Sequence, residues 1–365
     1  MTNSSNGVDR DEIAAEFNNG SGIYSSKLDT TDFNSLVVSL LSIISSTGLT
    51  GLNHHQSLGK ITTIDAMMSL PGLFITTGNA SLMKSLLIEE SRRVRKGQLP
   101  ISLSQRTDAT LDKSSEATLW LLEAIATYIS STGDQSILQE VLTPMVLAID
   151  RQIASNNNDI GLDPSDGLLS LKCEDLGSRK PIRLNSLWYS CLRNLEAWLK
   201  TAGWSDRKVA DLADLSAISF REKFWVARSG YLASETNQPN PNEPDSDQLF
   251  ALALTRPLIH GKLARSVVSH VRSSLLTPYG LRRGNSVLPW MLSPFVSAHL
   301  HAYGSKNSIE HVLDALIQIP SCTNHHLRKS LPLNTTSESG VPNHPNSLHL
   351  PSIASILQAD QLLSY

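Results

Sequence analysis

Apolar residues recur at helical spacing through nearly all of this chain, and that periodicity constrains the fold more than any other feature. From residue 32 onward the apolar positions fall three or four apart in segment after segment, as expected for helices that bury one face. We expect helices at 32–46, 80–95, 114–131, 134–155, 184–201, 205–225, 246–256, 260–275, 287–303, 307–319 and 350–363. The β-like pieces are short, and no strand–helix alternation or glycine-rich phosphate loop is present, so the sequence predicts an all-α protein.

Ten or more amphipathic helices in one chain must be arranged so that each apolar face is buried. A closed ring of paired helices achieves this in a single domain, and a helical-repeat solenoid achieves it too. The sequence has no fixed-period repeat of the kind that solenoids show. We therefore favour a ring spanning 31–365 as one domain, preceded by a flexible polar tail at 1–30.

The composition excludes several functional classes. The chain of 365 residues has 31 basic and 34 acidic residues, so no strong charge favours a nucleic-acid or polybasic membrane partner. Its three cysteines, Cys173, Cys191 and Cys322, are far apart and predict neither a disulfide framework nor a zinc motif. The first residues lack the apolar core of a signal peptide, and no run of 18 apolar residues occurs. We expect a soluble, cytoplasmic protein that does not bind membranes.

The histidines do not form a recognisable metal-binding motif. His54 and His55 are adjacent, as are His325 and His326, and neighbours on a helix do not share a face. The H-E-x-x-H spacing of zinc helices is absent. We therefore predict no metal site and no other cofactor.

The longest connections are predicted at 155–183, 229–246 and 320–348, and all are rich in Asn, Asp, Pro and Ser. Loops of this length on a compact scaffold often carry functional residues, because the scaffold holds them in place.

Short segments distributed along the chain carry a resemblance to a known family. They are D-A-M-M-S-L-P-G from Asp65, D-P-S-D-G-L-L from Asp163, P-I-R-L-N-S-L-W-Y from Pro181, D-Q-L-F-A-L-A-L from Asp247, L-L-T-P-Y-G-L-R from Leu275 and L-P-W-M-L-S-P-F from Leu288. Together they resemble the C-terminal, amylo-α-1,6-glucosidase domain of glycogen debranching enzymes. The resemblance runs from Leu36 to Leu363. It implies an (α/α)6 toroid of six helical hairpins, as in the six-hairpin glycosidases, with the sugar site at the mouth of a central funnel.

The resemblance also implies an α-glucan, glycogen-like in structure, as substrate or ligand, and a set of residues that contact it. Helix capping is the alternative role for the acids of this set, and buried packing is the alternative for its aromatic residues. The implied substrate-binding residues are Asp65, Glu116, Trp120, Asp166, Asn185, Trp188, Tyr189 and Trp290.

The family's general acid aligns with Asp175, in the segment L-K-C-E-D-L-G that follows D-G-L-L. Hydrolysis of a glycosidic bond needs such a protonated carboxyl to protonate the leaving oxygen. Glu174 is adjacent, and a solvated pair of loop acids is the alternative reading. The chain departs from the family at Arg183, where the family has a glutamate. A guanidinium only donates hydrogen bonds, whereas a carboxylate accepts them.

The second catalytic carboxylate has no direct counterpart. The family's base position falls near Leu333 or Asn334, and Glu338 is the nearby acid. An inverting glycosidase needs two carboxyls on opposite sides of the bond, so Asp175 and Glu338 are the predicted catalytic pair. The alternatives are a catalytically inactive descendant that binds α-glucan or another protein, and a helical scaffold without a sugar role. The sequence does not predict the oligomeric state.

Overall fold

The computed structural model describes residues 31–54, 61–103, 112–154, 160–173, 177–204, 207–236, 244–277, 280–283, 286–306, 309 and 349–364. These residues are mostly helical, with short strands between some helices. The α-helices are α2 (Thr31–Thr47), α3 (Thr63–Leu70), α4 (Ala80–Arg93), α5 (Asp112–Thr132), α6 (Leu138–Ala154), α7 (Ile182–Thr201), α8 (Arg207–Phe224), α9 (Phe250–Ala253), α10 (Gly261–Ser274), α11 (Leu292–Tyr303) and α14 (Leu350–Ser364). Short helical turns are η2 (Leu49–His54), η3 (Pro71–Ile75), η4 (Gln135–Ile137), η5 (Ser246–Leu249) and η6 (Pro289–Met291).

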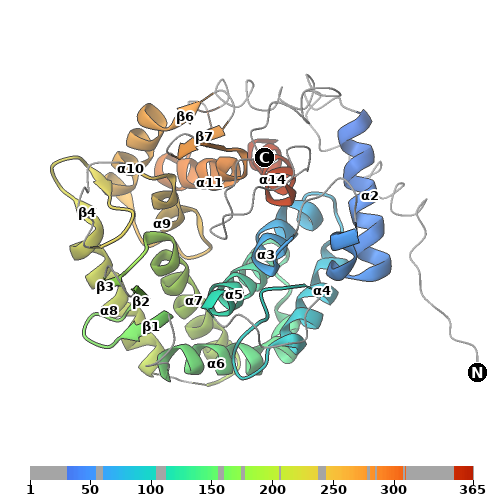
Figure 1. The fold of residues 1–365 in the computed structure, drawn as a ribbon, viewed down its shortest axis with the longest axis horizontal. Helices are drawn as coiled ribbons and strands as arrows, with labels where there is room; N and C mark the ends of the chain where they lie inside the picture. The colour runs from blue at the N-terminus through green and yellow to red at the C-terminus, as the bar shows by residue number, and fades with distance from the viewer. Residues whose placement is uncertain are drawn as a thin grey trace, which may run out of the picture.

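Six of these helices form a closed inner ring (Figure 1). Helix α3 contacts α5, α5 contacts α7, α7 contacts α9, α9 contacts α11 and α11 contacts α14. Helix α14 then returns to α3, so the C-terminal segment of the described chain closes the ring against its N-terminal part. Helices α4, α6, α8 and α10 lie outside the ring, where they pack on α5, α7, α7 and α11.

The burial of each helix follows from its position in the ring. The outer helix α10 buries only Ala264, Val267, Val268 and Val271, which are spaced as one face of a helix. The inner helix α7 is buried on nearly all sides, including Asn185 and Ser190. An inner helix is covered by both neighbours in the ring and by an outer helix. Its polar residues must therefore find partners inside the protein.

Small antiparallel sheets occupy three connections from an outer to an inner helix. The first joins β1 (Ile160–Asp163), β2 (Leu168–Cys173) and β3 (Gly177–Arg179) between α6 and α7. The second pairs β4 (Trp225–Val226) with β5 (Tyr231–Leu232) before α9, and the third joins β6 (Leu276–Thr277), β7 (Gly280–Arg283) and β8 (Ser286–Leu288) before α11. The predicted helical character is therefore confirmed for the described residues, which also contain these small sheets.

The periodicity located most helices to within a few residues, with two exceptions. The helix predicted at 246–256 is the short turn η5 followed by α9, which ends at Ala253. Helix α3 was expected only through the family resemblance, because its eight residues are too few to show a clear period. The helix predicted at 307–319, the loop at 320–348 and the tail at 1–30 lie outside the described residues. Within the described part of the chain, none of the helices combines the length and the apolar character needed to cross a membrane.

Ring closure depends on a close approach between η3 and α14. Gly72 lies in η3, and a Cβ placed on it would lie 2.1 Å from the carbonyl oxygen of Ala354 in α14. This oxygen belongs to the backbone, so it cannot move aside as a flexible side chain would. Gly72 therefore allows α14 to pack closely against η3.

We predict that Gly72→Ala destabilises the fold by about 3 kcal/mol, because overpacking a rigid backbone contact costs that much. The matched control is Gly78→Ala. Gly78 has a φ of +76° and open space around its Cα, so the control should cost only the roughly 1 kcal/mol of left-handed backbone strain. Urea unfolding of both variants tests this, and equal losses of stability would contradict it.

Candidate functional site

Charged side chains gather where the inner helices begin. Glu116 lies near the start of α5, Arg183 lies in the first turn of α7, and Asp247 lies in η5 just before α9. Helix N-termini favour negative charge, which helps to hold the acids there. We call Glu116, Arg183, Asp245, Asp247 and Arg283 the mouth cluster.

Ion pairs connect the residues of the mouth cluster, which come from α5, α7, β7 and the segment of η5. Arg183 Nη2 lies 3.2 Å from Glu116 Oε1, and Arg183 Nη1 lies 4.0 Å from Asp247 Oδ2. Arg283 Nη2 lies 3.4 Å from the same Asp247 oxygen, and Arg283 Nε lies 3.2 Å from Asp245 Oδ2. The cluster thus alternates acids and arginines, so that each arginine lies between two carboxylates.

Two carboxylates of the mouth cluster are unusual. Burial and the neighbouring Asp247 charge raise the pKa of Asp245 above its ordinary value. The side chain of Asp247 is buried, and its Oδ1 has no hydrogen-bond partner among the described residues. A buried carboxylate oxygen without a donor is costly, so this atom is a candidate acceptor for a ligand hydroxyl.

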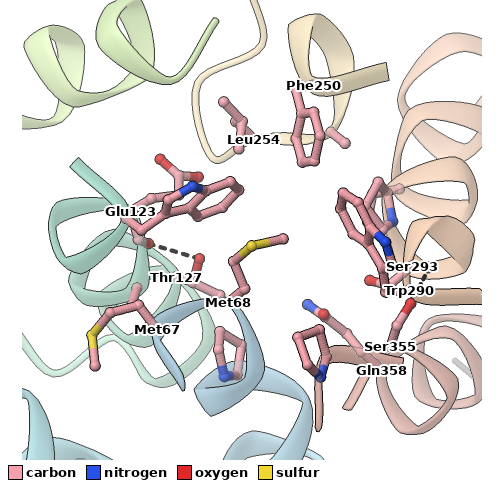
Figure 2. Close-up of a pocket in the computed structure, with 17 residues that line it drawn as sticks. Met67, Met68, Glu123, Thr127, Phe250, Leu254, Trp290, Ser293, Ser355 and Gln358 are labelled. Atoms are coloured by element: carbon pink, nitrogen blue, oxygen red, sulfur yellow. Dashed lines mark hydrogen bonds between the residues drawn. The ribbon is translucent and has the colours of Figure 1, made fainter. Parts of the chain in front are cut away.

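A pocket lies inside the ring, between inner helices α3, α5, α9, α11 and α14 (Figure 2). About 650 Å³ of space lies between its lining residues, a volume that includes open solvent. We call it the axial pocket. The residues that line it are Met67, Met68, Pro71, Trp120, Glu123, Ala124, Thr127, Phe250, Ala253, Leu254, Trp290, Ser293, Pro294, Ser297, Pro351, Ser355 and Gln358.

Aromatic side chains form one part of the axial pocket and connect it to the mouth cluster. Trp120 and Phe250 meet edge to face with ring centroids 5.6 Å apart, and Phe250 stacks on Trp290 at 6.2 Å. The indole N–H of Trp120 donates to Glu116 Oε1 at 3.4 Å. Trp120 therefore contacts both the pocket and the charged cluster.

Glu123 is the charged residue of the axial pocket, and its carboxylate is engaged on both oxygens. Oε1 accepts the backbone N–H of Thr255 at 2.6 Å, and Oε2 accepts the hydroxyl of Ser190 at 2.7 Å. Burial raises the pKa of Glu123, while these hydrogen bonds and the charge of Arg256 act in the opposite direction. The carboxylate therefore ties α5 to α7 and to the segment after α9.

The structure brings only some of the predicted sugar-contact residues together. Glu116, Trp120 and Trp290 lie at the mouth cluster or in the axial pocket. Asp65 caps α3 instead: its Oδ2 accepts the backbone N–H of Thr62 at 2.9 Å and the Thr62 hydroxyl at 2.7 Å. The charge of Asp65 also acts on His349, next to α14, whose pKa is nevertheless lowered by burial.

Two other predicted residues make contacts within the protein, away from the axial pocket. Asp166 is buried and pairs with Lys180 and Lys223. Asn185 is fully buried and bonds both backbone groups of Leu169, at 2.7 Å and 2.9 Å. Through these contacts, both residues stabilise the β1–β2 turn and its packing on α7.

The aromatic pair at the start of α7 is also engaged inside the protein. Trp188 has no exposed surface, and its indole N–H donates to the carbonyl of Gly167 at 3.1 Å. Tyr189 is half-buried and lies under the guanidinium of Arg193, 5.4 Å from the ring centroid. Neither residue lines the axial pocket.

The two predicted catalytic residues, Asp175 and Glu338, lie outside the described residues. The strands that flank Asp175 are described: Cys173 at the end of β2 pairs with Gly177 at the start of β3. Helix α7 begins directly after β3, so this hairpin precedes the helix that carries Arg183. Within the described residues, no group of three or more metal-binding side chains lies together.

Sequence reasoning missed Asp247 as a cluster residue and Glu123 as a pocket residue. Asp247 opens a segment that carried the family resemblance, so its position was available as a signal. Glu123 gave a weaker signal, a single acid within the apolar run L-W-L-L-E-A-I. A charged residue surrounded by apolar neighbours on a buried helix needs internal partners.

The chain matches one protein-family model. The model described as Amylo-alpha-1,6-glucosidase matches residues 31–175 and 177–286, which is well over half of the chain. This match confirms the resemblance found in the short segments. None of the curated proteins compared with the chain matches it.

The raised pKa of Glu123 predicts how its replacement changes stability with pH. A carboxyl whose pKa is raised by folding contributes stability below its ordinary value of 4.5, and this contribution is lost as the pH rises through the raised pKa. The free energy of unfolding of the wild type should therefore fall relative to that of Glu123→Gln as the pH increases above 4.5. Urea unfolding across this range measures the difference.

The control for this measurement is Glu140→Gln on the outer helix α6, where the glutamate side chain is 51% exposed. Glu140 makes only an exposed ion pair with Arg92, so this variant should differ from the wild type in unfolding free energy by no more than about 1 kcal/mol. Parallel profiles for Glu123→Gln and the wild type would show that ionisation of Glu123 is not linked to folding.

Proposed function

We propose that this chain, which belongs to the amylo-alpha-1,6-glucosidase family, is a debranching-type glycoside hydrolase domain that recognises α-glucan at the mouth of its ring. On this proposal the closed ring of inner helices is the (α/α)6 toroid of the six-hairpin glycosidases. The observation that carries the proposal is the mouth cluster, where charged groups from α5, α7, η5 and β7 meet beside Trp120.

The chemistry of the mouth cluster suits a neutral, hydroxyl-rich ligand. Sugar hydroxyls both donate and accept hydrogen bonds, and the cluster offers carboxylate acceptors beside guanidinium donors. The unpartnered Oδ1 of Asp247 is a ready acceptor. Trp120 adds a flat apolar surface next to these groups, as aromatic residues do in many ligand sites.

The hydrolytic step requires carboxyls that the family resemblance assigns to Asp175 and Glu338. Asp175 would protonate the leaving oxygen, and Glu338 would activate water on the opposite face of the sugar. The described carboxylates are poorly suited to these roles. Glu116 and Asp247 are paired with Arg183, and Asp65 is bonded to Thr62.

A second candidate function is α-glucan binding without hydrolysis. The specific observation in its favour is Arg183, a cation where the family has a glutamate, which forms ion pairs with Glu116 and lies near Asp247. An arginine here neutralises carboxylates that would otherwise contact the sugar directly. The two candidates share the same binding site and differ only in turnover.

Replacement of Arg183 tests the binding site common to both candidates. We predict that Arg183→Leu weakens retention by glycogen in a native affinity gel about tenfold, because loss of a charge-assisted contact costs roughly 1.5 kcal/mol. Arg193→Leu is the matched control. Arg193 lies on the same helix, is 23% exposed against 24% for Arg183, and pairs with two acids, Glu196 and Asp214, away from the ring mouth.

The control variant should retain the affinity of the wild type for glycogen. If both variants bind glycogen equally well, the mouth cluster is not the glucan site.

Glucose release from a phosphorylase-limit dextrin distinguishes the hydrolase from the binding domain. We expect release by the wild type and its loss in Asp175→Asn, since removal of a general acid typically costs 10²–10⁴-fold in rate. Retention of glycogen without any glucose release would reject hydrolysis and leave the binding function. Release that persists in Asp175→Asn would reject Asp175 as the acid.

A further inference from the structure

Four histidines lie in the packed helix pair α10–α11, outside both the mouth cluster and the axial pocket. His260 is the residue before α10, His270 lies within α10, and α11 carries His299 and His301. None of the four lines the axial pocket. We call these residues the histidine group.

Two members of the histidine group pack as flat rings against tyrosines. His270 stacks on the buried Tyr231 of β5, with ring centroids 4.6 Å apart, and its Nε2 has no hydrogen-bond partner among the described residues. His299 is 1% exposed and packs on Tyr303, one turn further along α11, at 4.7 Å. Protonation would place a charge in each of these buried contacts, which is unfavourable.

The other two members, His260 and His301, contact each other at the start of α10. Their rings meet edge to face with centroids 4.9 Å apart. His301 Nε2 lies 3.0 Å from the carbonyl oxygen of Ile259, which fixes its ring beside His260. Two charged imidazoles at this separation would repel each other, and the positive end of the α10 dipole also disfavours a charge on His260.

Cations lie close to the histidine group. Helices α10 and α11 contain no acidic residue. Arg221 of α8, which is followed by the exposed Glu222, acts on His260, and Arg272 acts on His299. Both arginines disfavour a further positive charge. The remaining cations of α10 are Lys262 and Arg265.

Acids are few on the described elements that pack against this helix pair. Asp247 of η5 lies beside Arg183 and Arg283. Helix α14, which packs on α11, carries the buried Asp360. The neighbouring elements β5, β6, α9 and η6 carry no charged residue. A proton gained by the histidine group is therefore compensated by few carboxylates.

The protonation of the group is linked to folding. Burial lowers the pKa of His260, His270 and His299, although hydrogen bonds to the backbone of Pro257 and Ser305 act in the opposite direction on His260 and His299. A group whose pKa is lowered by folding binds fewer protons in the native state. Stability is therefore lost as the pH falls below the ordinary histidine value of 6.5.

The C-terminal end of α10 connects the histidine group to the mouth cluster. The backbone N–H of Arg282 in β7 donates to the carbonyl of Leu275 at 2.8 Å, and its guanidinium donates to the carbonyl of Ser274 at 3.2 Å. The next residue, Arg283, lies 3.2 Å from Asp245 in the mouth cluster. A displacement of α10 would therefore move the strand that carries Arg283.

We propose that the histidine group is an acid-sensitive device that holds α10 against α11 and β5 while neutral, and that loosens α10 and displaces Arg283 from the mouth cluster when protonated. The loosening of α10 does not require that the mouth binds glucan. Only its effect on ligand binding rests on the proposed function.

Hydrogen exchange of the full chain at about pH 7.5 and about pH 5.5, on either side of the ordinary value of 6.5, tests the proposal. Exchange is expressed as protection factors, which remove the intrinsic pH dependence of amide exchange. Each histidine that stays neutral when folded lowers the protection by up to about tenfold over this range, so we expect α10 to lose at least about tenfold.

Helix α6 is the internal reference, because it is an outer helix without a histidine. Its protection should fall less than that of α10. Equal losses in α6 and α10 would mean that acid weakens the whole fold, and this result would overturn the proposal. No loss in α10 would overturn it as well.

His270→Phe is the informative variant. Phenylalanine can stack on Tyr231 as histidine does but cannot be protonated, and no hydrogen bond of His270 Nε2 is lost among the described residues. The variant should keep the protection of α10 at about pH 7.5 and recover up to about tenfold of the loss at about pH 5.5. Lys262→Gln, an exposed change on the same helix, is the matched control and should lose protection like the wild type.

His260→Asn tests the other end of α10, where the histidine is exposed and its replacement leaves the core intact. It should also reduce the acid-dependent loss, because it removes one of the two imidazoles in contact. If His270→Phe and His260→Asn both lose as much protection as the wild type, the histidine group is not the device.

Glycogen retention in a native gel at the same two pH values tests the link to the mouth cluster. The wild type should bind more weakly at about pH 5.5, and His270→Phe should restore part of the affinity. Loosening of α10 with unchanged glycogen affinity would reject the displacement of Arg283. If glycogen binds at neither pH, the proposed glucan function fails, and the protection of β7 then decides whether the loosening reaches Arg283.

Discussion

The contact of α14 with η3 and α3 closes the ring of inner helices. Each inner helix is apolar over most of its surface, so each needs a neighbour on both sides. A row of such helices that did not close would leave two apolar faces in water, and closure removes both. Because the closing helix comes from the far end of the chain, the backbone at Gly72 must approach that of Ala354 closely. This contact is long-range in sequence, so the fold requires its two ends to meet before the inner faces are fully covered.

The same closure concentrates polar residues in the interior and where the inner helices begin. An inner helix has little solvent-exposed surface, so some of its charged residues lie near its N-terminus or pair inside the ring. Arg183 illustrates the first case, with Glu116 and Asp247 as partners. Glu123 illustrates the second, since it is buried and bonded on both oxygens. Removing one partner of such a buried pair is costly because the other is left unsatisfied. A substitution within either cluster is therefore expected to cost stability. Their positions locate the ring mouth more directly than any single sequence motif does.

The sequence predicted the helices well and the site less completely, for a physical reason. Helical periodicity is local, so α7, α8 and α10 were placed within about two residues. The family segments located Glu116, Trp120 and Trp290, which do lie at the cluster or pocket. They did not separate these from Asn185 and Trp188, whose packing is set by the distant Gly167 turn. A residue type that suits sugar binding also suits a buried polar contact. Only the three-dimensional neighbours distinguish the two uses.

Arg183 shows how a change at one position alters what a whole site can do. With a glutamate there, three carboxylates would meet at the ring mouth, and their mutual repulsion would raise at least one pKa toward the range of a general acid. The guanidinium instead pairs with Glu116 and lies near Asp247. On the proposed function, the mouth cluster offers hydrogen-bond acceptors and donors to a neutral ligand. On the proposed function, the proton for hydrolysis would come from Asp175 rather than from the carboxylates that Arg183 contacts, and Glu338 would activate the attacking water.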